Sequence, residues 1–170
     1  MSYPQQIEKK VGVKIINAGV YGEFSSQGVS RLPSVLENKP EIVILCHGVN
    51  DIYFKHDVKQ LKENLLEMIN LIQNSGGKVL LAGISNFALL SKDIHAVYDE
   101  VAKESGVLFE DNICRIVLAS NLLKTDYRHP NARGYELMAD AFIDILNLPR
   151  TETAISSSRC YEYKKMKGMC

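Results

Sequence analysis

Four runs of continuous apolar residues stand out in the hydrophobic pattern of the chain. They are VKIIN (13–17), EIVILC (41–46), KVLLAGI (78–84) and VLFED (107–111). Apolar runs without strict alternation are typical of parallel strands that are covered on both faces. The pattern therefore predicts a strand at each of these four places.

Amphipathic stretches lie between the apolar runs and predict helices at 26–37, 58–74 and 93–105. The stretch 58–74 is the clearest of them, because its apolar residues repeat at helical spacing and Gly76 and Gly77 follow it directly. Its apolar face comprises Leu61, Leu65, Met68, Ile69 and Ile72.

A last helix is predicted to start at Pro130, since proline is favoured at the first helical position. Its apolar stripe comprises Leu137, Met138, Ala141, Phe142 and Ile145. The alternation of strands and helices indicates an open α/β sheet with right-handed crossovers. Such a fold normally opens on a strand, whereas this chain opens on a helix-like segment, YPQQIEKKV (3–11).

Composition narrows the class of protein. The 170 residues suffice for one domain with a substantial core, and 46% of them are hydrophobic. Twenty basic residues balance twenty acidic ones, so the net charge of zero offers no electrostatic reason to expect nucleic acid as a partner. No apolar run is long enough to span a bilayer. The N-terminus has no apolar signal-peptide core, so the chain as written would be cytoplasmic, while the compartment of the protein stays open.

Two further classes are disfavoured by missing motifs. The four cysteines show no CxxC or zinc spacing, and Cys46 is expected to be a buried free thiol in its apolar run. No G-x-G-x-x-G or P-loop pattern occurs, so a nucleotide-binding domain is a weak alternative.

Polar candidates follow the predicted strands, where open α/β sheets gather their functional groups. Gly22 follows 13–17, Asn50 follows 41–46, and Asp126 lies three residues before His129 near the end of the chain. Each has an ordinary structural explanation: a loop glycine, turn chemistry, and a capping arrangement at a helix start. His47, His56 and His95 show no partner spacing and are expected to be surface or packing residues.

The candidates nevertheless fit a single reaction, acyl transfer, if they lie together at the carboxyl edge of the sheet. Asp126 would accept from one ring nitrogen of His129, and the other nitrogen would act as general base. The Asn50 amide and the Gly22 N–H would bind a developing oxyanion. This is the equipment for acyl transfer without its nucleophile, because no G-x-S-x-G elbow occurs and no cysteine follows a strand suitably.

The ordered blocks resemble those of the SGNH hydrolases, also called the GDSL lipase/esterase family, from about Tyr3 to Leu148. The second block of the family is similar to INAGVYGEFSSQGVSRLPSVL, with Gly22 as the oxyanion glycine. The third block of the family is similar to PEIVILCHGVND, with Asn50 as the oxyanion asparagine. The fifth block is similar to DYRHPNARGYELMADAF, with Asp126 and His129 as acid and base. In pattern the chain is most like the small bacterial lysophospholipases, thioesterases and arylesterases.

The resemblance implies a three-layer α/β/α fold with a flavodoxin-like, mostly parallel sheet, and a serine esterase that needs no metal or organic cofactor. It also implies a missing first strand, because the block with Gly-Asp-Ser should precede Tyr3 and about twenty residues of it are absent. The expected organisation is thus an N-terminally truncated domain at 1–149 and a polar tail at 150–170. An unfilled slot is expected between the strands at 13–17 and 41–46.

Two functions remain open at this point. The first is hydrolysis of a small-molecule ester, with the chain inactive as given because its serine is absent. The second is a non-catalytic ligand-binding or interaction remnant of the same fold. Self-association through unpaired strand edges is expected in either case, and many relatives in the family are periplasmic or secreted.

Overall fold

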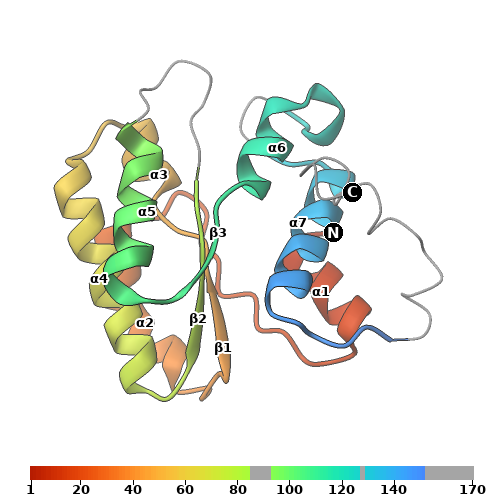
Figure 1. The fold of residues 1–170 in the computed structure, drawn as a ribbon, viewed down its shortest axis with the longest axis horizontal. Helices are drawn as coiled ribbons and strands as arrows, with labels where there is room; N and C mark the ends of the chain where they lie inside the picture. The colour runs from red at the N-terminus through yellow and green to blue at the C-terminus, as the bar shows by residue number, and fades with distance from the viewer. Residues whose placement is uncertain (85–92, 127–128, 152–170) are drawn as a thin grey trace. The chain divides into compact units, whose positions relative to one another are not determined.

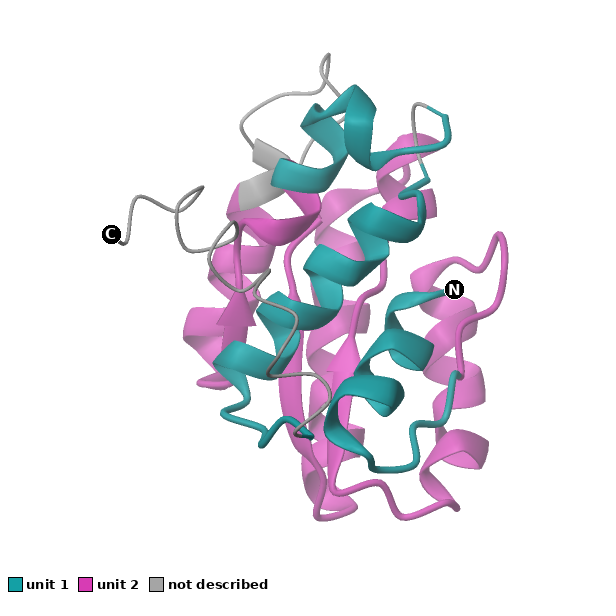
Figure 2. Ribbon diagram, turned by 90° about the vertical axis from the view of Figure 1, so that its right-hand side faces the viewer, with its two compact units in different colours: residues 1–17, 116–170 teal, residues 18–115 magenta. Residues whose placement is uncertain are grey.

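A computed structural model of the chain describes residues 1–84, 93–126 and 129–151 (Figure 1). The chain divides into two compact units. Unit 1 joins residues 1–17 to residues 116–170, and unit 2 comprises residues 18–115 (Figure 2).

Unit 2 is an α/β unit built on a parallel sheet. Its strands are β1 (Ile42–Leu45), β2 (Lys78–Ala82) and β3 (Leu108–Glu110), paired in parallel in the order β1-β2-β3. Its helices are α2 (Ser25–Leu36), α3 (Val49–Tyr53), α4 (Val58–Asn74) and α5 (Asp93–Ser105), and α2, α4 and α5 lie on one side of the sheet (Figure 1). The strands predicted at 41–46, 78–84 and 107–111 are therefore confirmed, with shorter bounds.

The core of unit 2 is centred on α4. All five residues of the predicted apolar face of this helix are at most 1% exposed. They pack with apolar side chains from the sheet and from α5, among them Leu45, Leu81, Tyr98 and Val101. Asp57 caps the start of α4 by accepting from the Lys59 N–H, and Gly76 follows its end with a φ of 89°. The helical pattern and its end signals were thus sufficient to predict α4.

Strand β1 forms an open edge of this sheet. The carbonyl of Glu41 accepts from the Lys78 N–H, so Glu41 faces β2. Backbone groups of successive strand residues point to opposite sides, so Ile42 and Ile44 direct theirs away from β2. In the part of the chain that the structure describes, no strand pairs with that edge.

The predicted strand at 13–17 is wrong. These residues have no strand or bridge, and Val13 and Ile16 are 51% and 47% exposed. An apolar, β-branched run becomes a strand only when a neighbouring strand satisfies its backbone groups, and no described strand pairs with this segment. The expected slot between two strands is therefore not formed as predicted, because only one of its two walls is a strand.

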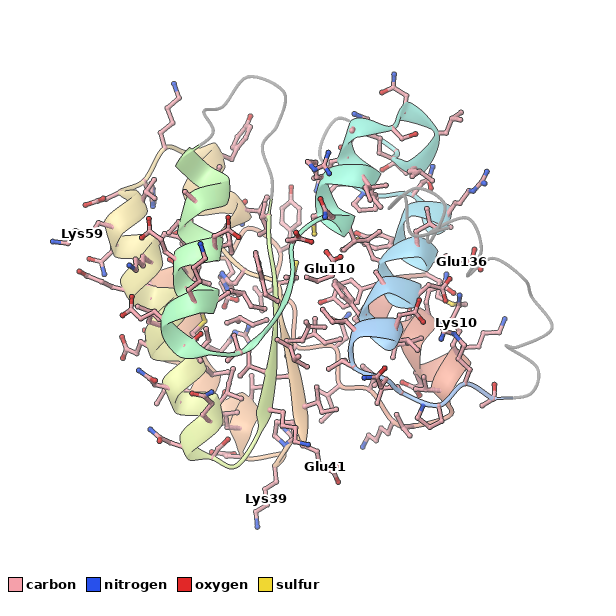
Figure 3. All side chains as sticks on the ribbon, viewed as in Figure 1. Lys10, Lys39, Glu41, Lys59, Glu110 and Glu136 are labelled. Atoms are coloured by element: carbon pink, nitrogen blue, oxygen red, sulfur yellow. The ribbon has the colours of Figure 1, made fainter. Side chains whose placement is uncertain are left out.

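Unit 1 is helical in its described part. It contains α1 (Tyr3–Val11), the 3-10 turn η1 (Asn121–Leu123) and α7 (Ala132–Ile145), while α6 (Ile113–Ala119) begins in unit 2 and ends in unit 1. Helix α1 packs on α7, and the rings of Tyr3 and Phe142 meet edge to face at 5.2 Å. Lys10 donates to both carboxylate oxygens of buried Asp140 at 2.7 and 2.8 Å, and Glu136 lies beside it (Figure 3).

Helix α7 starts two residues later than predicted. Asn131 is its N-cap, and the Asn131 side chain accepts from the N–H groups of Arg133 and Gly134. Pro130 instead forms an isolated bridge with Lys124. The Asn131 side-chain oxygen stabilises this start, because it accepts from two N–H groups of the first turn that have no partner within the helix.

The apolar stripe predicted for α7 is confirmed for four residues, which are at most 4% exposed, while Ile145 is half-buried. Three short elements were not predicted: α3, α6 and η1. Among the described helices, none has both the length and the apolar character needed to cross a bilayer.

Candidate active site

The first element of the candidate site is the Asp126–His129 pair in unit 1. The ring Nδ1 of His129 lies 2.8 Å from Asp126 Oδ2 and 3.0 Å from Oδ1, and the backbone N–H of His129 donates to Oδ1 at 2.9 Å. A carboxylate beside Nδ1 holds the proton on that nitrogen and leaves Nε2 able to accept one. About half of each side chain is exposed, so the pair is accessible.

A closed loop positions this pair ahead of α7. The Thr125 N–H donates to the His129 carbonyl at 2.9 Å, and the Asn131 N–H donates to the Leu123 carbonyl at 2.9 Å. The Asn131 amide also donates to the Leu122 carbonyl at 2.9 Å. One asparagine therefore caps α7 and ties the loop to η1.

Gly134 allows this close approach, and its replacement by alanine is expected to destabilise the fold by about 1–3 kcal/mol. A Cβ at this position would overlap the Leu123 carbonyl and lie 2.8 Å from Val117 Cγ1. Urea denaturation of Gly134→Ala would measure the loss, with Ala132→Ser on an exposed position of the same helix as the control. A change below about 0.5 kcal/mol, the range of neutral surface substitutions, would contradict the packing described here.

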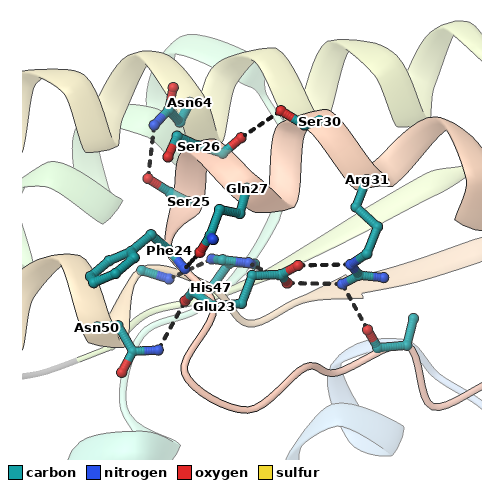
Figure 4. Close-up of polar contacts among 12 residues, drawn as sticks. Glu23, Phe24, Ser25, Ser26, Gln27, Ser30, Arg31, His47, Asn50 and Asn64 are labelled. Atoms are coloured by element: carbon teal, nitrogen blue, oxygen red, sulfur yellow. Dashed lines mark hydrogen bonds and ion pairs between the residues drawn. The ribbon is translucent and has the colours of Figure 1, made fainter.

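The second element is the pair of candidate oxyanion donors in unit 2. Asn50 lies in the first turn of α3, and its Nδ2 donates to the Glu23 carbonyl at 2.9 Å (Figure 4). Glu23 directly follows Gly22, whose φ of 76° suits a residue without a side chain. The Gly22 N–H has no hydrogen bond to another described residue. The structure thus brings Asn50 to the loop that carries Gly22.

A buried polar network holds the start of α2 against α3 and α4. Ser25 is 0% exposed, and its N–H and Oγ donate to the Asp51 carboxylate at 2.9 and 2.6 Å. The Asn64 amide donates to Ser25 Oγ at 2.8 Å. The Ser25 hydroxyl thus donates its proton to Asp51, accepts from Asn64 and is buried, so it is not presented to a substrate. The sequence showed no sign of this network.

Glu23, Arg31 and His47 form a second network beside the Gly22 loop (Figure 4). Arg31 donates to the Glu23 carboxylate through Nε at 2.7 Å and Nη2 at 2.8 Å, and His47 Nε2 lies 3.2 Å from it. The Arg31 hydrogen bond is the main reason why the pKa of Glu23 lies below its usual value. The spacing of His47 in the sequence gave no sign of this partner, because the carboxylate lies 24 residues earlier in the chain.

Two cysteines also meet in unit 2. Cys46 follows β1 and is a free, half-buried thiol, more exposed than predicted. It contacts the thiol of Cys114, and this hydrogen bond lowers the pKa of Cys46 and raises that of Cys114. The two residues are 68 positions apart, so their spacing could not reveal the contact. Among the described residues, no group of three or more potential ligands is arranged to hold a metal ion.

The family model that describes the GDSL-like lipase/acylhydrolase family matches residues 1–137. The chain is 39% identical over 72 residues to the esterase TesA of Pseudomonas aeruginosa, a match covering 42% of this chain and 36% of that protein. It is 26% identical over 140 residues to the arylesterase of Vibrio mimicus, covering 79% of this chain and 70% of the relative.

A solved structure agrees with these matches. The crystal structure of AlinE4, an SGNH-hydrolase family esterase, aligns with a TM-score of 0.61 at 26% identity and covers 81% of this chain and 78% of that one. The predicted family and its α/β fold are confirmed. The chain spans about a third of the length of the Pseudomonas esterase that it matches.

Proposed function

Because this chain belongs to the GDSL-like lipase/acylhydrolase family, we propose that it supplies the acid, the base and the oxyanion donors of an ester hydrolase. Asp126 orients His129, His129 is the general base, and Asn50 and Gly22 stabilise the oxyanion. The observation that carries the proposal is the 2.8 Å contact between Asp126 and His129 Nδ1, which leaves Nε2 as a proton acceptor.

The reaction would proceed through an acyl-enzyme. His129 Nε2 takes the proton of a serine hydroxyl as the oxygen attacks the ester carbonyl, and the alcohol leaves with that proton. Water activated by His129 then releases the acid. The charge on the carbonyl oxygen is met by the Asn50 amide and the Gly22 N–H, neither of which is used up by contacts among the described residues: Asn50 has a second amide hydrogen.

The serine would come from a Gly-Asp-Ser segment, which does not occur among these 170 residues. Ser25 is enclosed in the Asp51 network, and Ser26 follows it in the first turn of α2. We therefore expect the 170-residue chain to have negligible esterase activity, with a residual of about 10³–10⁴ over water from binding and oxyanion stabilisation.

The test is hydrolysis of p-nitrophenyl acetate and butyrate, small aryl esters whose product is easily followed. The 170-residue chain is compared with the same chain preceded by a strand and Gly-Asp-Ser, and with a version of the latter whose serine is alanine. Turnover is expected only when the serine is present. Turnover by the 170-residue chain that survives Ser25→Ala and Ser26→Ala but is lost with His129→Ala would place the nucleophile elsewhere in the chain.

Replacement of Asn50 by alanine is expected to lower kcat of the serine-bearing chain by about 10²–10³, the usual cost of one oxyanion donor. Steady-state kinetics with p-nitrophenyl butyrate would measure it. Asn38→Ala is the matched control, because Asn38 is an exposed asparagine whose amide donates only to the nearby Val35 carbonyl. An effect below tenfold would remove Asn50 from the oxyanion role.

The alternative function is that of a ligand-binding or interaction protein of the same fold. The in-frame codons upstream of Met1 separate the two. A strand followed by Gly-Asp-Ser there supports the hydrolase, whereas a stop codon close to Met1 supports the binding protein.

Self-association through the open edge of β1 is also expected, together with a melting temperature below about 60 °C. Ile44→Pro would remove an N–H that faces the open edge and should reduce association without breaking the β1–β2 ladder. Val43 faces β2, so Val43→Pro should unfold the sheet instead. Sedimentation over a range of concentrations and a thermal melt would check this, and a monomer with a cooperative melt above about 60 °C would refute it.

A further inference from the structure

Glu23, the residue after the candidate oxyanion glycine, is held through both its backbone and its side chain. Its carbonyl accepts the Asn50 amide at 2.9 Å. Its carboxylate, with the side chain only 8% exposed, accepts two hydrogen bonds from Arg31 and a contact from His47 (Figure 4). Arg31 and His47 therefore hold the side chain of Glu23, while its backbone carbonyl holds the Asn50 amide.

Arg31 attaches both ends of the loop that carries Gly22. Its guanidinium forms the two-pronged pair with Glu23, and Nη2 also donates to the Ala18 carbonyl at 2.9 Å. Arg31 itself lies in the regular part of α2, so a single rigid helix position fixes residues on either side of the glycine. This fork geometry is specific to arginine, because lysine offers one ammonium without a planar pair of donors.

His47 completes the carboxylate's surroundings from the end of β1. The Gly48 N–H donates to His47 Nδ1 at 3.0 Å, which leaves the ring proton on Nε2, where it faces Glu23 Oε2. Gly28 makes room for this ring, since a Cβ there would lie 2.6 Å from His47 Nε2. The loop, the second helix and the first strand therefore meet at one carboxylate.

The loop between Ala18 and Glu23 has little else to hold its central part. None of Val20, Tyr21 and Gly22 has a hydrogen bond to another described residue, and Tyr21 is 90% exposed. The orientation of the Gly22 N–H is thus determined by the attachments on either side of it.

We propose that Glu23 and Arg31 are positioning residues of the candidate oxyanion site: their ion pair fixes the Gly22 N–H and, through the Glu23 carbonyl, the Asn50 amide. A role of the two residues in catalysis rests on the proposed function, whereas their hydrogen bonds to the Gly22 loop do not depend on it. Removing one partner of an ion pair of low exposure costs stability, because the remaining charge is left without its partner. Replacement of either residue should therefore lower thermal stability, and the proposal adds that it also loosens the loop.

The experiment uses the 170-residue chain labelled with ¹⁵N. Relaxation measurements give the order parameter of the Gly22 N–H, and the side-chain amide signals of Asn50 report its bond to Glu23. In the unchanged protein Gly22 is expected to be as rigid as regular backbone, with an order parameter near 0.85. In Glu23→Gln and Arg31→Lys this value should fall below about 0.6 and the Asn50 amide signals should shift. Lys62→Gln is the control, because Lys62 on α4 pairs with Glu100 and Glu104, whose side chains are exposed on α5 in the same unit.

Two results would overturn the proposal. One is a mobile Gly22 in the unchanged protein, which needs no variant and so does not depend on the variants folding. The other is a loss of thermal stability in the variants with Gly22 and Asn50 signals like those of Lys62→Gln, which is the behaviour of a purely structural ion pair. Neither the NMR signals nor the thermal melt depends on turnover, so a negative result for this proposal is distinguishable from a negative result in the esterase assay.

Discussion

Replacement of His129 by alanine is expected to lower kcat about 10⁶-fold in a chain that carries the nucleophilic serine, the cost of removing the base from a serine-hydrolase triad. The reason is that no other group would take the serine proton. His129 is the histidine whose ring meets a carboxylate within hydrogen-bond range through Nδ1. Without the imidazole the hydroxyl stays protonated and is a poor nucleophile at neutral pH.

Single-turnover kinetics with p-nitrophenyl butyrate would measure the effect and separate acylation from product release. His56→Ala is the matched control, since His56 is an exposed histidine that stacks on Phe24 at 4.5 Å and has no place in the proposed mechanism. Its kcat should be close to that of the parent chain. A loss below 10²-fold for His129→Ala would mean that another residue acts as the base.

Replacement of Asp126 by asparagine is expected to lower kcat about 10⁴-fold in the same serine-bearing chain. The Asp126 carboxylate now accepts from the ring Nδ1 and from the His129 backbone N–H together. An amide of the same shape has one acceptor and one donor, so it permits the tautomer that carries its proton on Nε2. That tautomer cannot accept the serine proton.

Asp57→Asn provides the control for Asp126→Asn. Asp57 is an exposed aspartate that caps α4, and asparagine is an equally good cap, so both activity and stability should persist. KM should change little for Asp126→Asn, because the loss is in the chemical step. A variant with normal kcat and raised KM would instead assign Asp126 to substrate binding.

Local pattern predicted most of the described elements, because their cause is local. Helix α4 follows from five apolar residues at helical spacing and two glycines behind it, and the strands of unit 2 follow from short apolar runs. The Asp126–His129 contact also has a local cause. The two residues are three positions apart, so their contact does not depend on a distant part of the chain.

The errors arise where a local signal competes with a partner. The run at 13–17 has the composition of a strand, yet no described strand accepts its backbone. At the start of α7, Pro130 predicts the first helical residue, but Asn131 after it offers a side-chain oxygen to two helix N–H groups. In both cases hydrogen-bond satisfaction decided the outcome, and residue preference did not.

The sequence by itself determined the family, the parallel α/β pattern of unit 2, and the identity of the Asp126–His129 pair, since these depend on residues close together in the chain. Only the tertiary structure decided that the Asn50 amide reaches the Glu23 carbonyl beside Gly22. It also decided that Arg31 and His47 both contact the Glu23 carboxylate. These contacts join residues 8 to 27 positions apart on different elements. Their geometry depends on how α2, β1 and α3 pack, because hydrogen bonds form only where packing brings donor and acceptor within about 3 Å.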